Sequence, residues 1–336
     1  MDFRPVERDR GAYQQSVTAD EVELLCRRAF GASVRVVSAV ELGLGLYNST
    51  YRVDIGRERP VILRVAPEPA RQSRDERELM RNEHATVPYL SPIGSLLPTT
   101  LAIDFTHEVI PRDWMFQTLL SGLPGPDVLV RYPKSEQAPF YRQLGTLTRR
   151  VHAIRGERFG SVAGPWFPSW SDAVLASMRD IVADLDDAGV ETGDVREAVA
   201  IAEWNWTVLD EITEPRLLTG DLWTVNVMID PDAAEPTITG VCDCDRASWG
   251  DPESDWPLII AGRAPGTERD VFWDTYPALS STPGALVRAQ IYRVRALAAG
   301  RLERHRLGKA QDRTWGEMQA ALVELRAAAG AHRPTR

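Results

Sequence analysis

Three polar residues in the second half of the chain have the types and spacing for proton and metal chemistry. In "LLTGDLWTVNVMID" (residues 217–230), apolar residues lead into Gly220 and Asp221, four residues follow, and Asn226 precedes another apolar run. This pattern predicts a loop between two short strands that presents a carboxylate and an amide toward one point. Asp243 ends a further apolar run, "TITGVC", so its carboxylate is expected next to that loop.

Two carboxylates and an amide in one place suit a hard divalent cation. Mg²⁺ prefers oxygen ligands and is usually held by one or two carboxylates together with substrate phosphates. A carboxylate that is not a metal ligand can orient a hydroxyl group and accept its proton. A single Asp in a turn more often caps the loop than carries out chemistry. The combination of all three residues favours the chemical interpretation.

The first part of the chain is predicted to be rich in strands. Thr18 and Glu21 form a capping-box pattern for a helix that ends near Gly31. Runs rich in β-branched residues predict a meander of three antiparallel strands, and a helix and two more strands follow. These segments are residues 33–42, 49–55 and 60–66 for the meander, 74–90 for the helix, and 100–110 and 114–120 for the last strands. The turn-rich stretch "SGLPGPD" then marks a lobe boundary, giving an N-lobe of residues 1–118 and a C-lobe of residues 119–336.

The second part is predicted to be mainly helical. Apolar residues at helical spacing occur in residues 135–154, 169–188 and 195–212, and helices continue to the end after two short strand-like runs. The sequence therefore predicts an α+β fold with two lobes. The N-lobe has an antiparallel sheet with one main helix, and the C-lobe is helical with short strand pairs, an arrangement that can close over a ligand.

Two motifs carry a resemblance to a known family. "TGDLWTVN" resembles the catalytic His-Gly-Asp, four residues, Asn motif of the aminoglycoside phosphotransferase family, and "GVCDCDRASWGDPESD" resembles its metal-binding segment ending in Gly-Asp-Pro and a further Asp. The family has a fold similar to that of protein kinases and includes choline-, homoserine- and fructosamine-kinase-like enzymes. The resemblance runs from about residue 18 to about residue 300. It implies transfer of the γ-phosphate of ATP or GTP, with Mg²⁺, to an alcohol group.

The resemblance assigns roles to individual residues. Asp221 would be the catalytic base, and Asn226 and Asp243 would be the Mg²⁺ ligands. Positioning and charge neutralisation would carry most of the catalysis, because phosphoryl transfer needs little covalent help from the protein. The segment "ELGLGLYNSTYRV" resembles the nucleotide loop, although two glycines alone also fit a plain hairpin turn. Its phosphate-contacting residues would be Gly43, Gly45, Asn48, Ser49 and Thr50.

Arg64 stands where the family has a lysine that holds the nucleotide's α- and β-phosphates. Arginine keeps the charge but presents a planar fork in place of a point charge. Its helix partner is predicted to be Glu83, with Glu76 and Glu78 as alternatives. The segment "WMFQTLL" would be the hinge that binds the purine base. Its nucleotide-binding residues would be Gln117 and Leu119.

A second departure from the family is Thr219, which stands where the family usually has histidine. A threonine hydroxyl that bonds to the backbone could brace the loop in place of that histidine. His152, in "TRRVHAI", stands where family members often have a helix histidine and is expected to be structural.

The acceptor site is predicted near the catalytic loop. Asp251, Glu253 and Asp255, with Trp249 and Trp256, would form an acidic and aromatic wall suited to a cationic acceptor such as an aminoglycoside or a basic peptide antibiotic. The alternative is that Asp251 caps a helix and the tryptophans belong to the core. The residues expected to bind the acceptor are Trp223, Asp245, Asp251, Asp255 and Trp256.

Composition limits the partners. The net charge of −9 argues against nucleic-acid binding. Residues 288–336, however, hold eleven basic residues against four acidic ones, which is either a solvated helical face or a surface for an anionic partner. No apolar run reaches membrane-span length and the first residues do not resemble a signal peptide, so we expect a cytoplasmic protein with no membrane partner. Cys26, Cys242 and Cys244 are expected to be reduced, packed thiols.

Three functions fit the sequence. The first is an ATP- or GTP-dependent kinase of a small hydroxylated molecule, including antibiotics. The second is a kinase of Ser and Thr hydroxyls on a peptide in natural-product maturation, with an acidic leader docked on the basic residues 288–336. The third is a nucleotide-binding pseudokinase scaffold, suggested by Arg64 and Thr219 but opposed by the presence of Asp221, Asn226 and Asp243.

Overall fold

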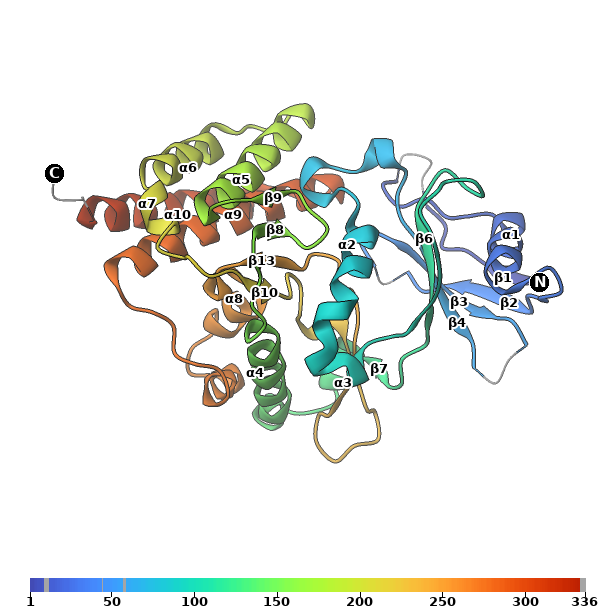
Figure 1. The fold of residues 1–336 in the computed structure, drawn as a ribbon. Coiled ribbons are helices and arrows are strands. Elements are labelled where there is room, and N and C mark those ends of the chain that lie inside the picture. Colours follow the sequence, from blue (N-terminus) through green and yellow to red (C-terminus); the bar gives the residue numbers. More distant parts are fainter. Residues whose placement is uncertain (9–11, 44, 57–58, 333–336) are drawn as a thin grey trace. The chain divides into compact units, whose positions relative to one another are not determined.

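The computed structural model describes residues 1–8, 12–43, 45–56 and 59–332 (Figure 1). The chain forms two compact units. Unit 1 comprises Met1–Gln72, Arg77–Pro133 and Thr224–Asp245, and unit 2 comprises Ser73–Glu76, Lys134–Trp223 and Arg246–Arg336. The lobe boundary expected after residue 118 lies inside unit 1, because β7 (Leu123–Pro124) pairs with β11 (Val227–Ile229) and draws both segments into that unit.

Unit 1 is built on a six-stranded sheet with the order β1-β2-β3-β4-β6-β5. Its strands are β1 (Asp2–Arg4), β2 (Ser38–Glu41), β3 (Ser49–Asp54), β4 (Val61–Val65), β5 (Thr100–Asp104) and β6 (Trp114–Thr118). The pairs from β2 to β5 are antiparallel, as predicted. The sequence did not predict β1, which pairs parallel with β2 at the edge of the sheet.

Helix α1 (Ala19–Phe30) provides the core on one side of this sheet. The capping box is confirmed, since the Thr18 hydroxyl accepts the Glu21 N–H and the Glu21 carboxylate accepts the Thr18 N–H. Apolar residues of α1 and of alternating strand positions form one cluster. The buried members include Val22, Leu25, Tyr51, Leu63 and Phe116.

The helix expected over residues 74–90 is much shorter. Helix α2 covers only Leu79–Thr86, preceded by the 3₁₀ turn η2 (Arg74–Glu76) and followed by the 3₁₀ segment η3 (Val87–Leu96). The backbone causes this difference. Glu78 has a φ of 56°, in the left-handed region that does not continue an α-helix, and Pro88 is the second residue after the end of α2.

The rest of unit 1 is a small three-stranded sheet with the order β12-β11-β7. Helix α3 (Gly125–Leu129) follows β7, and β11 pairs antiparallel with β12 (Ile238–Val241). The register sets Val227 opposite Val241, and the Cys242 N–H donates to the Asn226 carbonyl at 3.0 Å. The hairpin therefore fixes Asn226 and the residues after β12 at the same end.

Unit 2 is mainly helical around a four-stranded sheet with the order β10-β13-β8-β9 (Figure 1). Its α-helices are α4 (Ala138–His152), α5 (Trp170–Asp187), α6 (Gly193–Trp204), α7 (Trp206–Leu209), α8 (Trp256–Gly262), α9 (Pro283–Arg306) and α10 (Asp312–Ala331). Its strands are β8 (Phe159–Ser161), β9 (Trp166–Phe167), β10 (Arg216–Leu218) and β13 (Ser248–Gly250). Short 3₁₀ turns, η4 (Lys134–Glu136), η6 (Pro252–Ser254) and η7 (Glu268–Asp274), connect them, and η1 (Pro69–Arg71) and η5 (Thr224–Asn226) lie in unit 1.

The α+β fold class predicted from the sequence is confirmed. The helix expected over residues 195–212 is two helices, because the chain leaves α-helical geometry at Asn205. Across the described ranges, no helix has the length and apolar character that a bilayer crossing requires. Cys26 and Cys244 are buried and Cys242 is half-buried, all as free thiols.

Candidate functional site

The predicted catalytic loop of unit 2 follows β10. Gly220 has a φ of 75°, and a Cβ atom there would lie 2.2 Å from the Arg246 carbonyl oxygen, so only glycine fits this turn. The next residue, Asp221, is half-buried at the point where the chain leaves the turn. Its position is therefore set by backbone packing between residues 220 and 246.

Asp255 holds this loop in place through hydrogen bonds. Its carboxylate is buried and accepts the N–H groups of Thr219 and Gly220, each at 2.8 Å. It also accepts the Thr219 hydroxyl and lies 2.8 Å from His152 Nε2. His152 Nδ1 in turn contacts the Tyr276 hydroxyl at 2.6 Å. Thr219 was expected to bond to the backbone, but its hydroxyl bonds to this carboxylate, because Asp255 already lies against the loop.

The network controls the charge of Asp255. Burial raises the pKa of this carboxyl. The hydrogen bond and charge of His152 and the hydrogen bonds from Thr219 lower the pKa by more than burial raises it, so it lies below its usual range. Asp255 is thus an ionised, fully enclosed acceptor for five donors of the loop and its surroundings. His152 has the structural position that was expected.

In unit 1, the β11–β12 hairpin brings the two predicted metal ligands to one end. Asn226 is buried directly before β11, and Asp243 follows β12 by two residues. Asp243 has a φ of 61°, a left-handed conformation that Asp tolerates better than most residues. This turn ends the strand and reverses the direction of the chain at the carboxylate.

Asp243 belongs to a cluster of acids. Within the described part of the chain, Glu83, Asp243 and Asp245 have carboxylate oxygens that all lie within 4.8 Å of one another. The donor set is entirely oxygen, which suits Mg²⁺. Asp245, expected to bind the acceptor, is instead a member of this cluster, where its backbone carbonyl accepts the Asn82 side chain at 2.7 Å.

Arg64 of β4 supplies the positive charge of this cluster. One arm of its guanidinium pairs with Glu83 and the other with Asp243, and Asp245 lies 3.9 Å away. Burial lowers the pKa of Arg64, but Glu83 and Asp243 raise it more, so the group stays charged. The predicted pairing with Glu83 is present. Glu76, a sequence alternative, pairs in unit 2 with Arg246 and Arg306, and Glu78 begins α2 without capping it.

The predicted nucleotide loop lies between β2 and β3. Gly43 has a φ of 66°, and the carbonyls of Gly45 and Asn48 both accept the Gln14 side chain at 2.9 Å. The Asn48 Oδ1 atom is buried and has no hydrogen-bond partner among the described residues. Ser49 is buried and its hydroxyl donates to the Gln15 carbonyl, so it is not available as predicted. Thr50, in β3, lies opposite Arg64 in the sheet.

The predicted hinge segment includes β6. Gln117 lies inside β6, flanked by β4 and β5, and its side-chain amide donates to Glu83 at 3.2 Å. The side chain therefore supports the Arg64–Glu83 pair, and contact of the segment's backbone groups with a purine base stays a prediction. Leu119 lies one residue beyond the strand and is half-buried.

The acidic wall expected for the acceptor does not face outward. Asp251 is buried, caps η6 and accepts the Tyr292 hydroxyl at 2.7 Å. Asp255 is buried too, and its carboxylate accepts hydrogen bonds from the catalytic loop. Both predictions of acceptor contact are therefore wrong for these side chains, because buried carboxylates need internal partners. Trp249 is a core residue, whereas Trp223 and Trp256 are half-buried and pack edge to face with centroids 6.4 Å apart.

The basic residues of 288–336 are largely engaged within unit 2. Arg301 is fully buried, makes two hydrogen bonds to Asp194 and stacks on Trp315 at 3.8 Å. Further arginines of this region also have acidic partners in the same unit: Arg288, Arg293, Arg306, Arg313 and Arg326. Arg333 and Arg336 lie outside the described residues. The enclosed pairs of Arg288, Arg301 and Arg306 thus hold α9 within unit 2, whereas the pairs of Arg293, Arg313 and Arg326 are exposed.

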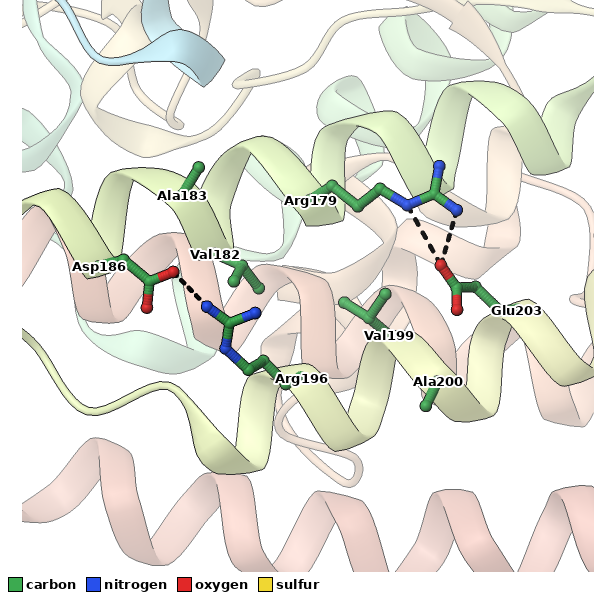
Figure 2. Close-up of a pocket in the computed structure, with 8 residues that line it drawn as sticks. All are labelled: Arg179, Val182, Ala183, Asp186, Arg196, Val199, Ala200 and Glu203. Carbon is green, nitrogen blue, oxygen red and sulfur yellow. Dashed lines mark hydrogen bonds and ion pairs between the residues drawn. The ribbon is translucent and has the colours of Figure 1, made fainter.

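A cavity of about 360 Å³ lies between α5 and α6 (Figure 2). Val182 and Val199 point into it, and ion pairs of Arg179 with Glu203 and of Arg196 with Asp186 cross it. None of its lining residues belongs to the predicted site. Its charges are balanced and paired, as is common in a groove between two packed helices.

Sequence reasoning did not find the brace made by Asp255 and Tyr276. Residues 219, 255 and 276 are far apart in the sequence, and no local pattern links them. The strongest indication of this brace in the sequence was Thr219, because a loop that lacks the family's histidine needs another group to hold it in place.

Comparisons with known proteins identify the family and the fold. Residues 38–282 match the model of the phosphotransferase enzyme family. A search of curated proteins found no match. Aminoglycoside phosphotransferase APH(4)-Ia is similar in structure, with a TM-score of 0.61 at 19% identity, covering 94% of this chain and 99% of that chain. The GDP complex of wild-type aminoglycoside 2'-phosphotransferase-IIIa has a TM-score of 0.61 at 15% identity, with coverages of 94% and 99%.

A thermostable mutant of APH(4)-Ia in ternary complex with AMP-PNP and hygromycin B has a TM-score of 0.59 at 20% identity, covering 94% of this chain and 100% of that chain. The fold is therefore that of the protein-kinase-like phosphotransferases. Because the family model spans most of its length, this chain belongs to the phosphotransferase enzyme family, and it is a kinase with an alcohol group as acceptor.

Proposed function

We propose that this enzyme transfers the γ-phosphate of ATP or GTP to a hydroxyl group of a small molecule, with Asp221 as the base. The observation that carries the proposal is the loop after β10. Three donors of Thr219 and Gly220 hold it on one ionised carboxylate, which leaves Asp221 at the exit of a glycine turn. A fixed carboxylate at this position can orient a hydroxyl and take its proton.

The second part of the proposal concerns the nucleotide and the metal. Asn226 and Asp243 would hold Mg²⁺, with Asp245 nearby, and bound Mg²⁺ would neutralise phosphate charge. Arg64 would contact the nucleotide's phosphates from β4, and the loop from Gly43 to Thr50 would cover them. The AMP-PNP, GDP and hygromycin B in the similar structures support a purine nucleotide and a hydroxylated small molecule.

The peptide-kinase alternative keeps only part of its motivating observation. An acidic leader needs a displayed basic surface, but Arg288, Arg301 and Arg306 are paired inside unit 2. A small-molecule acceptor needs no such surface. We therefore retain the small-molecule kinase as the proposed function.

The test compares Asp221→Asn with Asp270→Asn, an exposed aspartate of the same unit that accepts a backbone N–H. Transfer of labelled γ-phosphate from ATP and GTP is measured against a panel of hydroxylated compounds, and nucleotide binding is measured by calorimetry. We expect Asp221→Asn to lose transfer by about 10²-fold or more while nucleotide binding persists. Unchanged transfer in Asp221→Asn would remove the assignment of the base.

A further inference from the structure

An arginine that the sequence analysis did not select lies beside the loop of the proposed acceptor site. Trp256 directly follows Asp255, which holds the loop before Asp221, and Trp223 lies two residues after Asp221. The two indole rings meet at 90°. The guanidinium of Arg263, at the end of α8, lies over the Trp256 ring at 4.8 Å from its centroid. All five residues belong to unit 2.

Arg263 differs from most arginines nearby because it lacks an acidic partner. Arg293 pairs with Glu324 and Arg313 with Glu317, but Arg263 has no ion pair or hydrogen bond among the residues that the structure describes. It is an exposed residue, and its guanidinium lies over the face of Trp256. Stacking on an aromatic ring orients a guanidinium while leaving its N–H groups free to bind an anion.

The surroundings of Arg263 are positive. Burial lowers the pKa of Arg263, Glu317 partly opposes this, and the charges of Arg269, Arg313 and Arg293 lower the pKa further. Arg269 also donates to the Ile260 carbonyl of α8 at 3.2 Å, so a second positive charge adds to the local field at the helix that carries Arg263. Such a field attracts anions and repels polycations.

The hydrogen-bonding character of the tryptophan pair points the same way. The indole N–H groups of Trp223 and Trp256 are buried and have no acceptor in the described parts of the chain. An indole offers a donor and no acceptor. Asp251 and Asp255, the acids that precede α8 in the chain, are used inside the fold. A ligand group that reaches the indole N–H groups must therefore bring its own hydrogen-bond acceptor.

We propose that the acceptor of this kinase carries a carboxylate or phosphate group, which Arg263 binds on the Trp256 face while the acceptor hydroxyl lies at Asp221. This inference rests on the proposed function. In the transfer, the acceptor hydroxyl oxygen forms the new bond to the γ-phosphorus, and the bond to the β-phosphate oxygen breaks. The nucleoside diphosphate leaves, and the hydroxyl proton passes to Asp221. The inference separates this enzyme from one that selects polycationic aminoglycosides.

The test uses matched sets of hydroxylated compounds in acid, uncharged and amine forms, such as glucuronate, glucose and glucosamine. Phosphate transfer is measured with wild type, Arg263→Gln, Arg263→Lys and the control Arg179→Gln, an exposed ion-paired arginine of α5. We expect acid members to be preferred in wild type. Arg263→Gln is expected to lower kcat/KM for acid members by about 10-fold or more, leave the uncharged members unchanged, and be partly rescued by Arg263→Lys.

Each other outcome decides against the inference. The inference is overturned by a preference for amine members, by no transfer to any acid member, or by an equal effect of Arg263→Gln on acid and uncharged members. In each of these cases the proposed function still stands if turnover of the nucleotide depends on Asp221. If wild type neither binds nucleotide nor releases γ-phosphate, the proposed function has failed, and the inference fails with it.

Discussion

The brace under the catalytic loop yields the most quantitative prediction. In Asp255, Oδ1 accepts the N–H groups of Gly220 at 2.8 Å and Trp256 at 2.9 Å, and Oδ2 accepts both Thr219 donors and contacts His152. The substitution Asp255→Asn keeps the shape but replaces one oxygen by a donor. At least two buried N–H groups then lose their acceptor, at a cost of about 1–3 kcal/mol each. Two such groups give an expected total loss of about 2–6 kcal/mol of unfolding free energy.

Urea denaturation provides the free energy, and hydrogen exchange of peptides covering residues 217–222 locates the effect. Exchange should become faster at Thr219 and Gly220 in Asp255→Asn, because their N–H groups lose their acceptor. The exposed Asp270→Asn is the matched control and should change neither quantity. A loss under about 1 kcal/mol, with exchange at Thr219 unchanged, would refute the reasoning, because buried unsatisfied donors cannot be that inexpensive.

The pH dependence of the same substitution has a defined sign. Despite burial, the partners of Asp255 hold its pKa below the usual range in the folded state. A depressed pKa contributes stability that is fully present above the unfolded-state value of about 3.9 and is lost as the pH falls through the folded-state value. The stability difference between wild type and Asp255→Asn should therefore be constant near neutral pH and shrink only below about pH 4.

Two further substitutions test other parts of the structure. Asp194→Ala leaves the buried guanidinium of Arg301 without its carboxylate and should cost about 3–5 kcal/mol in urea denaturation, whereas Glu197→Ala in an exposed pair should cost less than about 1 kcal/mol. A similar loss in both variants would contradict the assigned burial. Arg64→Lys replaces a fork by a point charge and should loosen its contact with Asp243, so the Mg²⁺ concentration for half-maximal turnover is expected to fall. An unchanged Mg²⁺ dependence would show that the two cations do not compete.

Local chemistry could be predicted from the sequence where neighbours in the chain determine it. The Thr18–Glu21 capping box set the start of α1, and alternating apolar residues set β3 and β4. The end of the strand before Asp243 was also correct. The length of α2 was not, since the left-handed backbone of Glu78 depends on packing that propensity does not describe.

Charged residues were the least predictable part, because their partners are distant in sequence. Asp251 and Asp255 look like an exposed acidic wall until the fold supplies Tyr292 and His152. Arg301 looks like part of a basic surface until it meets Asp194. Sequence can show that a charge is present, but burial decides whether it forms an internal bond or a binding surface.

The two departures from the family pattern do not have equal consequences. Thr219 keeps the loop braced, because its hydroxyl and N–H group both reach the buried Asp255. Arg64 does more than replace a lysine. Its guanidinium pairs with both Glu83 and Asp243, so the carboxylate that is proposed to bind Mg²⁺ already has a positively charged partner. A metal ion at Asp243 must compete with that charge, and nucleotide phosphates offer the displaced guanidinium a new anionic partner. Metal and nucleotide are therefore expected to bind this enzyme together more readily than either binds alone, because each removes the electrostatic cost that the other would meet.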